Sequence, residues 1–172
     1  MTPEEIAKLP YRPCVGLMVV NAAGLIWAGR RSDGPGDAWQ MPQGGVDPGE
    51  APRDAAMREL GEETSIPASA VEVLAESEGW IPYDLPHDLV PKLWKGRYRG
   101  QAQKWFLLRF DGPEDVISIE TDEPEFVEWA WMAFPELLEK IVPFKADVYR
   151  EVWNAFGSHV DALRGAAAGD GS

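Results

Sequence analysis

The feature that most constrains this chain is a helix with three glutamates that begins directly after a loop rich in glycine and proline. Residues 51–64 predict the helix, because Pro52 suits a first turn and the residues after it are good helix formers. Glu59, Glu62 and Glu63 stand at i, i+3 and i+4, which places three carboxylates on one face of the helix. Whatever fold the chain adopts, a rigid element presents these acids beside the loop.

The remaining pattern predicts strands mixed with helices. Residues 14–20 and 25–29 are expected to form a hairpin about a turn at 21–24, and residues 30–49 a long loop. Further strands are expected at residues 71–75, 104–110 and 126–132. An amphipathic helix is indicated by apolar residues at every fourth position: Val148, Val152, Phe156 and Val160.

Length and composition favour one globular domain. The chain has 172 residues, which is enough for a single core, and 45% of them are hydrophobic. No segment has the ~18 apolar residues of a membrane span, and residues 1–10 lack the features of a secretory signal, so we expect a cytoplasmic protein. The single cysteine, Cys14, lies in an apolar run and is interpreted as a buried structural residue.

The charge of the chain is acidic with one local exception. A net charge of −13 argues against binding along duplex nucleic acid, so any nucleic-acid substrate must be held locally. Residues 89–110 contain six basic residues and no acidic one, interleaved with Trp94, Tyr98 and Trp105. This segment is either a solvated loop and strand or a surface that attracts phosphates and offers aromatic faces to bases.

The glutamate cluster suits a hard divalent cation. Like charges at i and i+4 destabilise a helix by roughly 0.2–0.5 kcal/mol per pair unless they are solvated or neutralised. Mg²⁺ prefers oxygen ligands, keeps several waters, and binds through a few carboxylates together with substrate phosphates. Three acids alone are also common on solvated helices, so the interpretation depends on the pattern around them.

That pattern resembles the Nudix box. Gly44 is followed after five residues by Glu50 and after seven more by Arg58, with Glu59, Leu60, Glu62, Glu63 and Ile66 at the remaining fixed positions. The match spans 23 positions and departs at one, because Ser65 stands where the family has glycine. A left-handed residue is common after such a helix, and serine would cost on the order of 1 kcal/mol there if the same backbone angles are kept.

The resemblance implies an α/β fold, a Nudix-type α/β/α sandwich around a mixed β-sheet, as a single domain at residues 11–164. Residues 1–10 are then an N-terminal extension, and residues 165–172 a frayed tail. The implied cofactor is Mg²⁺ or Mn²⁺, held by Gly44, Glu59, Glu62, Glu63 and one carboxylate from outside the box. Glu125 is the expected outside ligand, with Glu123 and Glu128 as weaker alternatives, while Arg58 is expected to pair with Glu50.

Motifs outside the box narrow the resemblance to one group of Nudix hydrolases. Residues 11–13, 39–45, 103–106 and 144–150 are similar to those of the bacterial RNA pyrophosphohydrolases and the related dinucleoside polyphosphate hydrolases. The group's implied substrate contacts in this chain are Arg12, Arg31, Lys104 and Lys145 for phosphates and Tyr83 and Phe144 for bases. Both aromatic residues are equally compatible with ordinary core packing.

Three functions follow from this resemblance. The first is removal of pyrophosphate from the 5′-triphosphate end of RNA, which leaves a monophosphate and promotes RNA decay. The second is asymmetric hydrolysis of diadenosine tetraphosphate to ATP and AMP. The third, a nucleotide-sensing module without activity, is disfavoured because Glu59, Glu62 and Glu63 are all present.

Overall fold

The computed structural model describes residues 1–31 and 38–170, and these form one mixed sheet with helices on both of its faces. The strands are β1 Tyr11–Val20, β2 Ile26–Arg31, β3 Trp39–Gln40, β4 Gln43–Gly45, β5 Val71–Glu76, β6 Ile81–Asp84, β7 Gly100–Phe110 and β8 Phe126–Met132. The helices are α1 Pro3–Ala7, α2 Pro52–Thr64, α3 Phe134–Lys140 and α4 Ala146–Asp170. Single turns of 3₁₀-helix are η1 Ala68–Ala70, η2 Val90–Lys92, η3 Trp94–Gly96, η4 Glu114–Val116 and η5 Pro143–Lys145.

Two long strands form the centre of the sheet. β1 and β7 run parallel over ten paired positions, from Tyr11 opposite Gly100 to Val20 opposite Arg109. Every other pairing is antiparallel: β2 pairs β1, β3 and β8, while β5 and β6 pair β7, and β4 pairs β1. The sheet is therefore mixed, as expected, and the hairpin at residues 14–29 is confirmed by the Asn21 side chain, which accepts the Leu25 amide at 2.9 Å.

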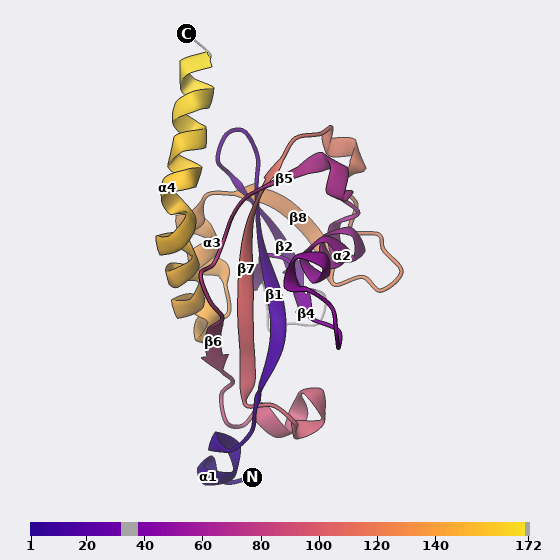
Figure 1. Cartoon of the computed structure of the whole chain (residues 1–172), viewed down its shortest axis with the longest axis vertical. Helices are drawn as coiled ribbons and strands as arrows, with labels where there is room; N and C mark the ends of the chain where they lie inside the picture. The colour runs from indigo at the N-terminus through magenta and orange to yellow at the C-terminus, as the bar shows by residue number, and fades with distance from the viewer. Residues whose placement is uncertain (32–37, 171–172) are drawn as a thin grey trace.

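Alternation along β1 divides the core into two layers. Met18 and Val20 face one cluster, which α3 and α4 cover, whereas Leu17 and Val19 face the other, which α2 covers. Figure 1 shows α4 and α2 on opposite sides of the sheet. The chain thus has the α/β/α sandwich around a mixed sheet that the resemblance implies.

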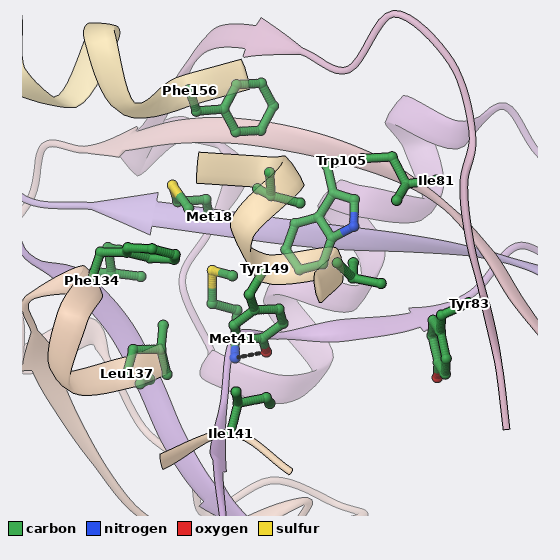
Figure 2. Close-up of a cluster of buried hydrophobic side chains, with 14 of the residues drawn as sticks. Met18, Met41, Ile81, Tyr83, Trp105, Phe134, Leu137, Ile141, Tyr149 and Phe156 are labelled. Atoms are coloured by element: carbon green, nitrogen blue, oxygen red, sulfur yellow. Dashed lines mark hydrogen bonds between the residues drawn. The ribbon is translucent and has the colours of Figure 1, made fainter. Parts of the chain in front are cut away.

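The cluster beneath α4 also fixes the strand that carries the first glycine of the box. Tyr149 of α4 is 1% exposed, and its hydroxyl accepts the Met41 amide at 2.8 Å, the bond dashed in Figure 2. Figure 2 also places Trp105 of β7 and Phe134 of α3 among the side chains around this bond. Because Met41 lies between β3 and β4, the core holds this connection in place ahead of Gly44.

The structure differs from the expectation at residues 30–49 and adds detail at both ends of the chain. The loop expected at residues 30–49 contains β3 and β4, whose short runs carry too few apolar residues to show a period; residues 32–37 lie outside the described part. Residues 165–170, expected to belong to a frayed tail, continue α4 to Asp170. The N-terminal extension includes α1, whose Ile6 is 4% exposed and packs in the core.

The turn after α2 keeps the family's backbone despite its serine. Ser65 has φ 65° and ψ 4°, a left-handed conformation, and its hydroxyl donates to the Ser118 carbonyl at 2.9 Å. This bond offsets part of the cost of the missing glycine.

In the described residues, no helix is long and apolar enough to cross a membrane.

Candidate active site

The acidic face of α2 turns toward β4. Ala56 and Leu60 are fully buried and anchor the helix to the sheet, so Glu59 and Glu63 are also carried inward and are only 9% and 6% exposed. The Gln43 amide of β4 donates to Glu63 Oε2 at 3.1 Å. A Cβ on Gly44 would lie 2.0 Å from Glu59 Cδ, so only glycine leaves room for this carboxylate.

Arg58 holds the acids of the box together. Its Nε and Nη2 donate to the two carboxylate oxygens of Glu50 at 3.0 and 2.9 Å, which is the pairing expected from the sequence. Nη2 also donates to the Gly45 carbonyl at 2.8 Å, while Nη1 reaches Glu59 at 2.8 Å and Glu62 at 3.3 Å. The side-chain hydrogen bond from Arg58 lowers the pKa of Glu50 to about 2.

Burial makes two of the acids hard to ionise. The pKa of Glu59 is raised by burial, which outweighs Arg58 and is reinforced by Glu62 and Glu125. The pKa of Glu63 is raised well above its ordinary value by burial and then by the charges of Glu59 and Glu125. A cation between these carboxylates would reverse both shifts, because opposite charge favours the ionised form.

The acidic cavity contains the expected outside ligand. It measures about 550 Å³ and is lined by the α2 acids together with Asp122, Glu123 and Glu125 from the segment before β8. Glu125 also lies 3.8 Å from Arg31. Glu128 instead pairs with Arg30 at 2.6 Å and is absent from the cavity lining in the described residues, so Glu125 is the better placed of the two.

The donor set fits Mg²⁺ better than a softer metal, because it consists of oxygens. Among the described residues, no group of three acidic side chains is drawn together closely enough to form a complete metal site. Mg²⁺ does not require a complete site of this kind, because it takes one or two carboxylates, several waters and the phosphates of its substrate. Glu59 and Glu63 are the buried candidates, and Glu62 and Glu125 the more exposed ones.

A second cavity, of about 720 Å³, joins the acids to a basic and aromatic wall. It is lined by Glu59, Glu62 and Glu63 and by five of the six expected substrate contacts: Arg12, Arg31, Tyr83, Phe144 and Lys145. Lys104 lines neither cavity in the described residues, and its expected role as a substrate contact stays a prediction. Strand alternation turns it away from Gln101 and Gln103 on β7, toward the face that α2 covers.

The cations of this wall are fixed by their neighbours. Arg12 Nη1 donates to Cys14 Sγ at 3.2 Å, and the guanidinium lies 5.2 Å from the ring of Trp94. Lys145 is 7% exposed, and burial together with the charge of Arg31 lowers its pKa to about 8. Lys145 is thus still mainly charged at neutral pH.

Tyr83 and Phe144 belong to both the core and the cavity. Their rings are 6.0 Å apart at 36°. Tyr83 is 7% exposed, and Phe144 is the more accessible of the two rings. Cys14 is fully buried and its pKa is raised to about 11 by burial, which confirms its structural role.

The sequence interpretation missed a chain of glutamines that supports the wall. Gln103 Nε2 donates to Gln101 at 2.8 Å and to Gln43 at 3.1 Å, and its own oxygen accepts the Trp105 indole at 3.0 Å. The signal was the alternation of residues 101, 103 and 105 on one face of β7. Trp94 was noted only as an aromatic residue within a basic segment.

Known proteins with this arrangement place the chain in a family. A family model described as the NUDIX domain matches residues 10–152. The chain belongs to the Nudix family. It is accordingly a hydrolase of the Nudix pyrophosphohydrolase type, and the family generally uses divalent metal ions.

Similar proteins are named more narrowly. A protein of Roseobacter denitrificans named RNA pyrophosphohydrolase is 61% identical over 160 residues, which cover 93% of this chain and 100% of that protein. A protein of the same name from Rickettsia bellii is 50% identical over 157 residues, or 91% of this chain and 96% of the relative.

Solved structures agree on the fold. The C. elegans Ap4A hydrolase binary complex has a TM-score of 0.60 at 19% identity, with 85% of this chain and 98% of that chain covered. The E. coli dihydroneopterin triphosphate pyrophosphohydrolase has a TM-score of 0.64 at 20% identity, with 83% and 96% covered. Since their substrates differ and their identity is low, these structures define the fold and not the substrate.

Proposed function

We propose that this protein removes pyrophosphate from the 5′-triphosphate end of RNA, leaving a 5′-monophosphate that opens the transcript to decay. The observation that carries the proposal is the continuous cavity in which the box glutamates face Arg12, Arg31 and Lys145. Proteins at 50–61% identity named RNA pyrophosphohydrolase support RNA as the substrate class. The proposed location is the cytoplasm, where transcripts turn over, and neither a membrane nor duplex DNA is a proposed partner.

The proposed division of labour follows the two ends of the cavity. Glu59, Glu62, Glu63 and Glu125 would hold Mg²⁺, or Mn²⁺ in its place, and the ion would neutralise phosphate charge and lower the pKa of a bound water. Arg58 keeps Glu59 in position by joining it to Glu50. In phosphoryl transfer the protein contributes mainly positioning and electrostatics, so this rigidity matters more than any single proton transfer.

The basic wall binds the remainder of the 5′ end. Arg12 is held by Cys14 and Trp94, and the Lys145 ammonium lies 5.9 Å from the centre of the Tyr83 ring. Both cations therefore bind phosphate oxygens with little loss of side-chain freedom. Phe144, half-buried over Tyr83, offers its ring for stacking with a base. Gripping one end and a nucleotide or two requires no extended positive surface, which suits a chain with a net charge of −13.

The test compares kcat/KM for 5′-triphosphorylated RNA and for diadenosine tetraphosphate, each with Mg²⁺. We expect a clear preference for RNA, with pyrophosphate and 5′-monophosphorylated RNA as products. A preference for the dinucleotide would contradict the proposal and assign the protein to nucleotide turnover. Cleavage of neither substrate would favour a binding module.

A further inference from the structure

The structure separates the six cations of residues 89–110 into two groups. Three of them belong to the sheet and its pairing partners. Arg99 pairs with Asp84 at 2.7 Å, and Lys104 lies on the α2 face of β7. Arg109 lies at the far end of β7, opposite Glu72. The other three are exposed, and within the described residues none of them forms an ion pair: Lys92, Lys95 and Arg97. We call these three residues the η2–η3 surface.

This surface lies on the outer side of a wall of the substrate cavity. Leu89, Leu93 and Trp94 line the cavity, and they alternate along the chain with the exposed cations. In Figure 1 the segment forms the rose-coloured turns next to the lower end of β1. A molecule that leaves the cavity over Leu93 and Trp94 therefore meets positive charge at once.

An unusual backbone supports a functional origin for this arrangement. Trp94, Lys95 and Gly96 have φ of 46°, 59° and 70°, three successive left-handed residues of which two carry side chains. Non-glycine residues in this conformation, here Trp94 and Lys95, are strained, and such residues concentrate at binding and active sites. The turn places Trp94 against Arg12, at 5.2 Å, while Lys95 remains exposed.

We propose that the η2–η3 surface binds the single-stranded RNA chain that follows the 5′ nucleotide. The inference rests on the proposed function and adds the path of the strand beyond the active site. Charge complementarity supports it, because the backbone of RNA is anionic, the protein is otherwise acidic, and residues 89–110 contain no carboxylate. A dinucleoside polyphosphate has no such continuation, so this surface raises the affinity for RNA relative to that for dinucleoside polyphosphates.

The experiment measures KM for 5′-triphosphorylated single-stranded RNA of two lengths, across a fourfold range of KCl. The short RNA is a dinucleotide, two nucleotides joined by one phosphodiester, and the long RNA is a dodecanucleotide. The variant Lys92→Gln/Arg97→Gln removes two cations of the surface and leaves the left-handed Lys95 in place. The control Arg53→Gln/Arg150→Gln removes two exposed cations of α2 and α4, so the net charge changes equally. Each neutralised phosphate contact on a single strand contributes about 0.7 to the slope of log K against log salt.

With the dodecanucleotide, the surface variant should lower this slope by about 1.4, which makes the rise in KM across the salt range about 7-fold smaller. The control and wild type should behave alike, and all three proteins should have the same KM for the dinucleotide, which also shows that the variant folds. Equal slopes for both variants, or no effect of RNA length in the wild type, would overturn the inference while RNA cleavage stands. Failure to cleave RNA of either length would overturn the proposed function and this inference together.

Discussion

The close approach of Gly44 to Glu59 gives the most direct test of the active site. In Gly44→Ala the new Cβ would lie 2.0 Å from Glu59 Cδ and 2.3 Å from each carboxylate oxygen, more than 1 Å short of the 3.4 Å at which ordinary contacts begin. Gly44 pairs with Val15 in the sheet, so its backbone is held, whereas Glu59 is a side-chain end that can turn away. The carboxylate is therefore expected to move by more than 1 Å while the fold is kept.

A displacement of this size at a catalytic group costs about 100-fold in rate. We expect kcat/KM for triphosphorylated RNA to fall by about that factor, with a higher Mg²⁺ requirement and a thermal midpoint close to that of the wild type. The matched control is Gly165→Ala, where a Cβ meets nothing within 4 Å on the exposed part of α4; it should keep full activity and add about 0.5–1 kcal/mol of stability. Gly44→Ala with activity within threefold of the wild type would refute the assigned crowding of Glu59.

Three further changes test other parts of the site. Glu63→Gln should lower kcat by at least about 100-fold in steady-state assays with Mg²⁺. The free energy of unfolding should not fall, because the substitution removes a carboxyl group that burial makes costly to ionise. Lys145 has a folded pKa of about 8 against 10.5 ordinarily, so the unfolded state holds more protons between these values and the unfolding free energy should rise with pH there. Urea titrations at both ends of this window should show that Lys145→Met lacks this rise, and an identical rise would contradict the burial of a charged lysine. Ser65→Ala should lower the unfolding free energy by about 1 kcal/mol, because the bond to Ser118 is lost and the left-handed backbone remains, whereas Ser65→Gly should be more stable than Ser65→Ala.

The sequence predicted the elements whose patterns are long and missed those that tertiary contacts create. The acidic helix was located to within one residue, and the strand at residues 126–132 with its observed bounds. β3 and β4 have two and three residues, too few for any period. They are strands because β3 pairs with β2 and β4 pairs with β1. Their positions could only be read from the fold.

The site followed the same rule. The spacing of Glu59, Glu62 and Glu63 within one helix predicted a shared face, because helical geometry alone decides it. The motif that contains Lys104 does not show which face of β7 this side chain takes, and only its pairing with Val15 places it on the α2 side. The position of Trp94 over Arg12 depends on a left-handed turn far from Arg12 in the sequence, and no local pattern specifies that contact.

The electrostatics of the cavity explain how so acidic a protein can bind a polyanion. The carboxylates gather at one end, where burial keeps the pKa values of Glu59 and Glu63 raised until a cation joins them. Arg12 and Lys145 stand on the wall of the same cavity, each fixed by its own neighbours. A triphosphate that binds together with its divalent ion would place the ion against the carboxylates and the phosphates against the basic wall. The triphosphate alone would be repelled by the acids, and the ion alone would leave the charges of the basic wall unpaired. Binding of ion and substrate should thus be mutually dependent, and reciprocal by linkage.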